Sequence, residues 1–223
     1  MEGYDVTKFD RPSVTVDLLL FTIKENELKL LLVKRNVEPY KDVWALPGGF
    51  VKMDESLDEA AKRELYEESG VKNVYLEQLY TFGEPKRDPR TRVITVAYYA
   101  LATNEDWDLK ATTDAAEASF FSIMELPKLA FDHKKIVEYG LERLRSKLGY
   151  SNVAFGLLPE EFTLTNLQNV YEIILGKAID KRNFRKKMMA TGLIVPTTHK
   201  QVKTKHRPAQ LFMFESRTLI NID

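Results

Sequence analysis

The chain has 223 residues, of which 44% are hydrophobic and 11% aromatic, with 33 basic and 33 acidic side chains and no cysteine. This composition excludes an intrinsically disordered chain, and the lack of cysteine excludes disulfides and cysteine metal sites. No apolar run is long enough to span a membrane and the charged first residues lack a signal core, so we expect a cytoplasmic protein without a membrane partner.

The zero net charge hides an asymmetry along the chain. Residues 1–150 carry 22 Lys and Arg against 27 Asp and Glu, whereas residues 151–223 carry 11 against 6. Opposite charges indicate two parts with different tasks. We therefore predict two domains, residues 1–148 and residues 149–223, with the linker at Gly149 to Asn152.

The first part begins with two predicted strands. Residues 14–23 and 28–34 are rich in β-branched residues and leucine, and residues 24–27 between them indicate a hairpin. A glycine loop follows, in which Gly48 and Gly49 let a phosphate approach the backbone closely. Arg35, between the second strand and this loop, fits a phosphate contact and an ordinary surface position equally well.

The most informative stretch is residues 49–71, GFVKMDESLDEAAKRELYEESGV. Ser56 is a good N-cap, a glutamate three residues later completes a capping box, and Gly70 can end the helix. Glu64, Glu67 and Glu68 then project together at spacings of i, i+3 and i+4.

These glutamates repel one another, at about a few tenths of a kcal/mol per pair on an exposed helix. A solvated acidic face is the ordinary explanation for such a cluster alone. A divalent cation is the alternative, because Mg²⁺ prefers a few carboxylate oxygens together with waters and substrate phosphates. The residues around the cluster favour the cation.

The stretch resembles the Nudix box, the signature of hydrolases that cleave nucleoside diphosphates linked to another moiety. The matching positions are Gly49, Glu55, Arg63, Glu64, Leu65, Glu67, Glu68, Gly70 and Val71. The resemblance implies an α/β fold, the Nudix α/β/α sandwich with a mixed sheet. It also implies that Glu64 and Glu68 hold Mg²⁺ with help from Glu67, and that Arg63 fixes the glutamates by ion pairing. The implied catalytic residues are Glu55, Arg63, Glu64, Glu67 and Glu68, with water attacking a metal-neutralised diphosphate.

A basic loop and a strong strand follow the box helix. Residues 74–82 predict a strand, residues 83–90 a loop rich in proline and arginine, and residues 92–103 a further strand. This arrangement resembles the ADP-ribose-directed branch of the Nudix proteins. The resemblance implies that a diphosphate binds to the fork-shaped side chains of Arg87, Arg90 and Arg92. A merely solvated basic loop is an equally supported alternative.

The first part closes with a short strand and a helix. Residues 118–123 predict the strand, and Glu117 before it lies where Nudix enzymes often place a further metal-binding or base glutamate. Residues 134–148 carry a helical apolar stripe. His133 has no second histidine or cysteine nearby, so we expect a helix-start residue rather than a metal ligand.

The tail predicts a compact helical domain. Thr165 and Gln168 form a predicted capping box for a helix that ends at Gly176. Asp180 can cap a second helix, residues 181–189, whose inward side chains are predicted to be Phe184, Met188 and Met189. Residues 193–195 and 210–214 predict the two strands of a wing.

The second helix and the wing are strongly basic. From Lys177 to Arg207 there are ten basic residues and one acidic residue, enough to neutralise several DNA phosphates. Two short helices across a tight turn are typical of a helix-turn-helix whose second helix enters the major groove, although protein or RNA contact is an alternative use. The predicted base-reading residues are Arg182, Asn183 and Arg185. The other predicted DNA-binding residues are Thr165, Lys181, Lys186, Lys203, Lys205 and Arg207.

As a whole, the chain is similar to the Nudix-related transcriptional regulators. This resemblance implies a homodimer that binds operator DNA through a winged helix and senses ADP-ribose, or a pentose such as arabinose, in its Nudix domain. Because the box is complete, a Mg²⁺-dependent ADP-ribose pyrophosphatase is the second hypothesis. A ligand-binding interaction module is the third.

Overall fold

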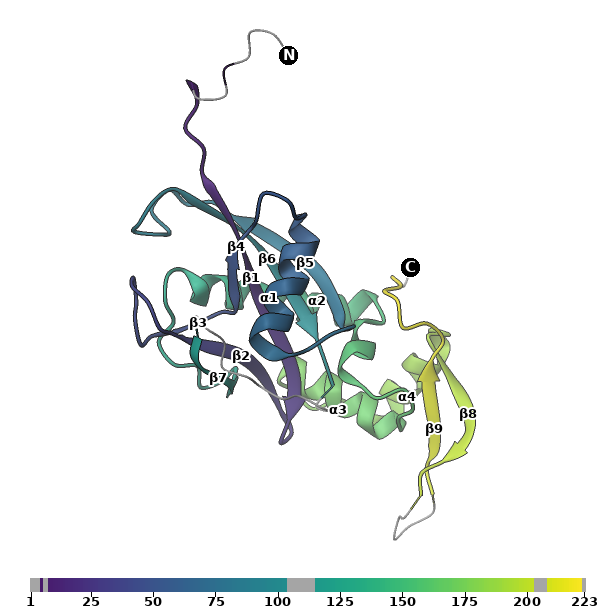
Figure 1. The fold of residues 1–223 in the computed structure, drawn as a ribbon. Helices are drawn as coiled ribbons and strands as arrows, with labels where there is room; N and C mark the ends of the chain where they lie inside the picture. Colours follow the sequence, from purple (N-terminus) through teal and green to yellow (C-terminus); the bar gives the residue numbers. More distant parts are fainter. Residues whose placement is uncertain (1–4, 6–7, 104–114, 203–207, 222–223) are drawn as a thin grey trace.

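The computed structural model describes residue 5 and residues 8–103, 115–202 and 208–221 (Figure 1). The first part contains β1 (Ser13–Lys24), β2 (Glu27–Arg35), β3 (Trp44–Ala45), β4 (Gly48–Phe50), α1 (Leu57–Ser69), β5 (Tyr75–Phe82), β6 (Val93–Leu101), β7 (Ala115–Ser122) and α2 (His133–Tyr150). The second part contains η2 (Val153–Leu157), α3 (Leu164–Leu175), α4 (Lys181–Ala190), β8 (Ile194–Lys200) and β9 (Gln210–Phe214).

A mixed sheet forms the centre of the first part. Its strand order is β3-β2-β1-β6-β5, with β4 paired to β1 and β7 paired to β2. β1 runs parallel to β6 from the pair Ser13 and Val93 onward, and antiparallel to β2 and β4. β1 carries apolar side chains on both of its faces, so a helix can pack on each side of the sheet. Leu18 and Leu20 pack with α1 on one face, while Leu19 and Phe21 pack with α2 on the other. The predicted α/β/α sandwich is confirmed.

The second part is a winged helix, as predicted. β8 and β9 form an antiparallel hairpin that projects from the body of the molecule (Figure 1). α3 begins earlier than predicted, because Thr163 rather than Thr165 is the N-cap. The Thr163 hydroxyl accepts from the Asn166 amide at 3.1 Å, and the Asn166 side chain accepts from the Thr163 amide at 3.0 Å. Phe162 pairs with Phe212 of β9 and fixes this start.

One prediction about α4 is wrong. Phe184 and Met188 are buried as expected, but Met189 is 49% exposed. Residues four positions apart share one face of a helix, whereas the next residue is turned by about 100°. Met189 therefore lies beside the basic side chains rather than in the core.

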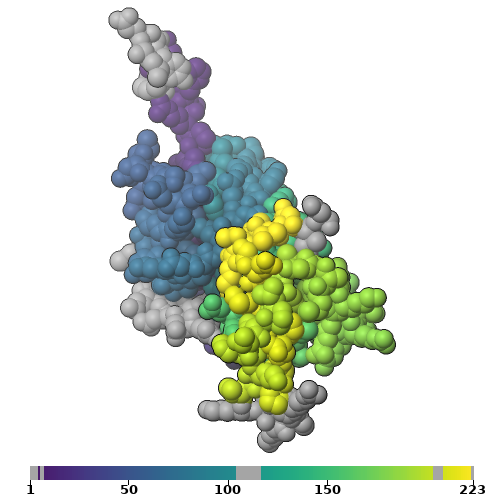
Figure 2. Space-filling view, turned by 90° about the vertical axis from the view of Figure 1, so that its right-hand side faces the viewer, coloured from purple at the N-terminus to yellow at the C-terminus, as the bar shows by residue number. Residues whose placement is uncertain are grey.

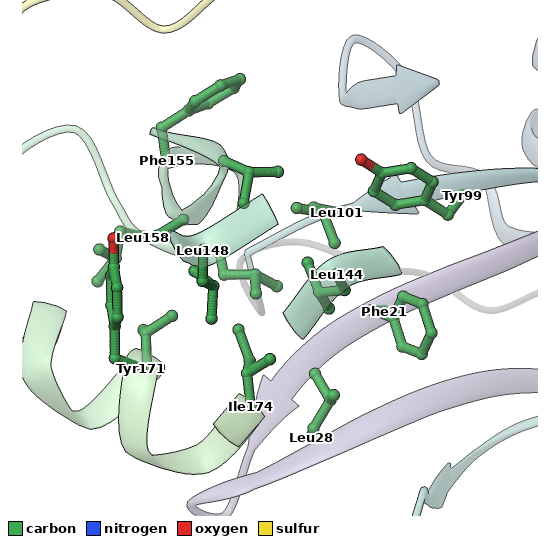
Figure 3. Packing of buried hydrophobic residues seen from close by; sticks show 14 of the residues in the cluster. Phe21, Leu28, Tyr99, Leu101, Leu144, Leu148, Phe155, Leu158, Tyr171 and Ile174 are labelled. Carbon is green, nitrogen blue, oxygen red and sulfur yellow. The ribbon is translucent and has the colours of Figure 1, made fainter. Parts of the chain in front are cut away.

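The two parts share one hydrophobic core. Leu144 and Leu148 of α2 lie in the same cluster as Phe155 of η2 and Tyr171 and Ile174 of α3 (Figure 3). The space-filling view shows the green and yellow C-terminal part in continuous contact with the blue and teal part on this face (Figure 2).

The second half of the segment predicted as a linker is buried beside this shared core, whereas Gly149 and Tyr150 are exposed at the end of α2. Ser151 and Asn152 are 0% and 1% exposed. The Ser151 hydroxyl donates to the Lys147 carbonyl, and the Asn152 side-chain oxygen accepts from the amide of Ile220. The connection is therefore fixed on both sides by hydrogen bonds. No helix in the described ranges is long and apolar enough to cross a membrane.

Candidate functional site

A cleft of about 900 Å³ opens between β1, β4, α1, the loop between β5 and β6, and the start of α2. It brings together many of the residues predicted from the sequence, although they lie far apart along the chain. These are Arg35, Gly48, Gly49, Arg63, Glu64, Glu67, Glu68, Arg87 and Arg90.

Arg63 holds the acidic side chains of the box in place. Its Nε and Nη2 donate to the two carboxylate oxygens of Glu55 at 2.9 and 2.6 Å, and its Nη1 donates to Glu64 at 2.7 Å and to Glu67 at 3.2 Å. These hydrogen bonds lower the pKa of Glu55 to about 2. Glu55 is thus an ion-pair partner of Arg63 and does not line the cleft.

Glu64 and Glu68 form the buried acidic part of the cleft. They are 8% and 9% exposed, and the Gly48 amide donates to Glu68 Oε2 at 3.1 Å. Burial raises the pKa of both carboxyl groups, and repulsion from Glu64 raises that of Glu68 further. A Cβ at Gly49 would lie 2.2 Å from Glu64 Oε1, so any side chain at this position would displace the Glu64 carboxylate.

These carboxylates fit a divalent cation. Desolvated groups that repel one another are stabilised by a nearby positive charge. Within the part of the chain that the structure describes, no three acidic or histidine side chains already surround one point. Glu67 is half-exposed and turns toward Arg63. An ion at Glu64 and Glu68 would therefore take its remaining ligands from water and phosphate, as Mg²⁺ commonly does.

A second buried charged network borders the cleft. Arg87, predicted to bind a diphosphate, lines the cleft but is buried and held by carboxylates. Its Nε and Nη2 donate to the two carboxylate oxygens of Asp132 at 3.1 and 2.7 Å, and Nη2 also donates to Asp17 at 3.2 Å. Two carboxylates hold this guanidinium, so it supports the cleft wall.

His133 is a buried part of the same wall. Its Nδ1 accepts from the Leu46 amide at 2.8 Å, so in the neutral ring the proton sits on Nε2, which lies 3.6 Å from Asp17 Oδ1. Burial lowers the pKa of His133. The residue starts α2, as predicted.

Two arginine side chains lie beside aromatic rings in another part of the cleft. The guanidinium of Arg35 lies 4.9 Å from the Phe131 ring centre, and that of Arg90 lies 5.8 Å from the same ring and 5.6 Å from Phe50. Arg90 also donates to both carboxylate oxygens of Asp88, at 3.0 and 2.7 Å. Its side chain is 40% exposed, so an anion can reach it. This arrangement suits a phosphate beside a flat base.

Besides Glu55, two further residues predicted for this site, Arg92 and Glu117, lie outside the cleft. Arg92 is exposed and does not line it. Glu117 of β7 is exposed opposite Lys34 of β2, whose neighbours Val33 and Arg35 line the cleft. Successive strand residues face opposite sides, so Glu117 shares the side of Lys34 and points away from the box.

Sequence reasoning missed several cleft residues, among them Asp17, Phe50 and Phe131, and also Asp132, which holds Arg87 of the cleft. A signal existed for Asp17, the single charge in the apolar run of residues 14–23. A lone acid inside a buried strand needs a partner, and here Arg87 supplies it.

The basic face of α4 forms the candidate nucleic-acid surface. Asp180 caps the helix by accepting from the Asn183 amide at 2.8 Å. All polar side chains of the helix are exposed, namely Lys181, Arg182, Asn183, Arg185, Lys186 and Lys187. Thr165 is exposed in the first turn of α3. Lys203, Lys205 and Arg207, also predicted to bind DNA, lie outside the described residues.

Two protein-family models match successive parts of the chain. The NUDIX domain model matches residues 12–140, and the NrtR DNA-binding winged helix domain model matches residues 154–214. The chain is also 37% identical to the ADPR responsive transcriptional repressor NtrR of Acinetobacter baylyi, over 95% of this chain and 85% of the relative. The chain belongs to the NrtR family of Nudix-domain transcriptional regulators.

Solved structures of the NrtR family resemble the whole chain and its first part. Shewanella oneidensis NrtR complexed with a 27mer DNA has a TM-score of 0.80 at 38% identity, covering 91% of this chain and 93% of that one. The NUDIX domain of the same protein complexed with ADP ribose has a TM-score of 0.58 at 37% identity, covering 64% and 94%. The ADP-ribose pyrophosphatase of Methanocaldococcus jannaschii is 42% identical over 57% of this chain and 72% of its own.

Proposed function

We propose that the chain is a DNA-binding transcriptional repressor whose Nudix cleft takes ADP-ribose as its effector. The observation that carries this proposal is the similarity of nearly the whole chain to an NrtR structure that contains DNA. The relative named as ADPR responsive and the NUDIX domain structure that contains ADP ribose support the choice of effector.

The exposed face of α4 is the surface proposed to enter the major groove. Arg182 and Arg185 suit guanine edges and Asn183 suits adenine. Lys181 and Lys186 position the helix on phosphates. The buried pair Phe184 and Met188 fixes this face relative to α3, because Phe184 packs edge-on against Tyr171 at 5.1 Å between ring centres.

The cleft fits a nucleotide diphosphate in size and chemistry. A volume of about 900 Å³ lies in the usual range for small-molecule sites. Arg90 is proposed to bind the diphosphate, and Phe131 to stack against the base beside Arg35. Glu64 and Glu68 would hold a divalent cation, which would supply positive charge opposite the phosphates.

We further propose that the chain acts as a homodimer. Helix-turn-helix proteins commonly bind two half-sites about one helical turn apart, so that operator symmetry matches protein symmetry. The single winged helix of this chain offers one such reading helix.

Fluorescence anisotropy with fragments of the chain's own genomic neighbourhood tests the proposal. We expect selective binding that weakens with salt and that ADP-ribose reduces, while arabinose at the same concentration has no effect. Absence of selective DNA binding at every salt concentration would overturn the regulator. Selective binding that arabinose alone alters would overturn the effector.

A second candidate function is Mg²⁺-dependent hydrolysis of ADP-ribose. Two observations favour it. The carboxylates of the box gather around Arg63, and the first part of the chain is 42% identical in sequence to an ADP-ribose pyrophosphatase. Water would attack the diphosphate, so the products would be AMP and ribose 5-phosphate. Product analysis with Mg²⁺ decides the question, and the absence of AMP from the wild type would exclude this activity.

A further inference from the structure

The start of α2 borders the cleft. Phe131 lines the cleft below Arg35 and Arg90, and His133 lines it while accepting from the Leu46 amide. Between them, Asp132 is held by Arg87 through two hydrogen bonds. Three successive residues at the beginning of one helix are therefore fixed by the cleft.

Arg87 shares a short loop with Arg90, the exposed arginine of the cleft. The Arg87 amide donates to the Glu84 carbonyl at 3.1 Å, and the Arg90 amide donates to the Asp88 side chain at 2.9 Å. Both hydrogen bonds lie within the loop between β5 and β6. Because Arg87 and Arg90 flank Asp88 on one short loop, we expect an anion that draws Arg90 away from Asp88 to move Arg87 as well.

The other end of α2 is attached to the winged helix. Arg145 Nε donates to the carbonyl of Ile174, at the end of α3, at 2.9 Å. Leu144 and Leu148 pack in the shared core with Ile174 (Figure 3). The 18 residues of α2 span about 27 Å at 1.5 Å per residue. One rigid helix thus contacts both the cleft and α3.

We propose that α2 carries the effector signal from the cleft to the winged helix, and that the ion pair between Arg87 and Asp132 sets the position of its first turn. This inference rests on the proposed function and names its regulation. A ligand changes DNA affinity only if it binds two arrangements of the protein with different strength. Here the two arrangements differ in how Arg87 holds Asp132, and close packing passes the shift along α2 to α3. Arg87 is thus a positioning residue.

The test measures how strongly ADP-ribose and DNA affect each other's binding. The coupling factor is the DNA dissociation constant at saturating ADP-ribose divided by the constant without it, measured by anisotropy on the full-length protein. Wild-type coupling is expected in the usual range for allosteric proteins, about 5- to 150-fold. Asp132→Asn keeps the shape of the side chain but removes its charge. We expect its coupling to fall below about twofold.

Two further variants complete the test. Glu138→Gln removes an exposed ion pair with Lys134 on the same helix and should keep wild-type coupling. Arg145→Gln acts at the far end, so calorimetry should show unchanged ADP-ribose affinity while coupling falls. If circular dichroism shows that Asp132→Asn does not fold, the coupling factor of Arg145→Gln tests the proposal in its place.

The outcomes separate the inference from the function on which it rests. Wild-type protein that binds no DNA, or whose DNA affinity ADP-ribose leaves unchanged, would contradict the proposed function and the inference together. Normal wild-type coupling that survives in both Asp132→Asn and Arg145→Gln would overturn the inference alone. Loss of coupling in Glu138→Gln would also overturn it, because any change on α2 would then suffice.

Discussion

Arg63 binds both carboxylate oxygens of Glu55, at 2.6 and 2.9 Å, from a position eight residues further along the chain. This bidentate pair joins the loop before α1 to the helix itself. It leaves Nη1 free to hold Glu64 and Glu67. The spacing of charged residues in the box therefore places one guanidinium within hydrogen-bond distance of three carboxylates.

We expect the pair to make stability depend on acid pH. The folded pKa of Glu55 is about 2, below its ordinary value of 4.5, so its contribution is present above pH 4.5 and is lost as the pH falls toward 2. Chemical denaturation should show that Glu55→Gln is less stable than wild type at pH 7 and that the difference shrinks in acid. An equal difference at every pH would contradict the assigned ion pair.

Glu68 should behave in the opposite way. Because burial raises its folded pKa, the charged carboxylate destabilises the protein increasingly as the pH rises above 4.5. Glu68→Gln should therefore melt at a higher temperature than wild type at pH 8 without metal. Mg²⁺ at 100 times its dissociation constant should stabilise wild type by about 2.7 kcal/mol and the variant hardly at all. Glu117→Gln, outside the cleft, should respond to Mg²⁺ like wild type.

Arg90 should contribute to effector affinity. Charged hydrogen bonds contribute about 1.5–3 kcal/mol, so Arg90→Gln should weaken ADP-ribose binding about 10- to 100-fold in isothermal titration calorimetry. Arg92→Gln is the matched control, because this side chain is exposed outside the cleft. Equal losses in the two variants would show that general positive charge, rather than the cleft, attracts the ligand.

The basic residues of α4 should divide into two kinds. Arg182→Ala or Arg185→Ala should lower operator affinity by about 1–3 kcal/mol and reduce discrimination between operator variants. Lys186→Ala should weaken binding to all sequences and lower the salt slope by about one. Lys134→Ala, on α2, should do neither. Anisotropy across a salt series measures both quantities, and uniform effects from all α4 variants would argue against base reading.

The shared core should make the two parts unfold together. Leu148→Ala removes a buried side chain between α2 and the winged helix and should cost about 2–5 kcal/mol. Calorimetry should show a single transition for wild type and for the variant. Two separate transitions, with only one moved by the substitution, would contradict a common core.

Local patterns predicted most of the elements because their causes are local. Each signal lies within a single element. Examples are the apolar run of β1, the cap and end of α1, and the apolar stripe of α2. The sequence also predicted that the acidic residues of the box lie together at one site, because one loop and one helix carry them all. Such patterns do not reveal partners from distant parts of the chain.

The same physical reason accounts for the features that the sequence did not reveal. Arg87 looked available for phosphate, yet its partners Asp132 and Asp17 lie 45 and 70 residues away in sequence. Glu117 looked like a base, but strand register decides which side it faces. Within the segment Gly149 to Asn152, predicted as a linker, the burial of Ser151 and Asn152 depends on Ile220 and the core, which local patterns do not show.

The buried junction also limits how the chain can be broken. Cutting near Ser151 would leave the apolar residues of η2 and α3 facing water, so the released basic fragment would aggregate or be degraded rather than persist on DNA. Damage to the sensor half would therefore remove the DNA-binding half as well. A chain broken at this junction would therefore leave its DNA site empty rather than permanently occupied.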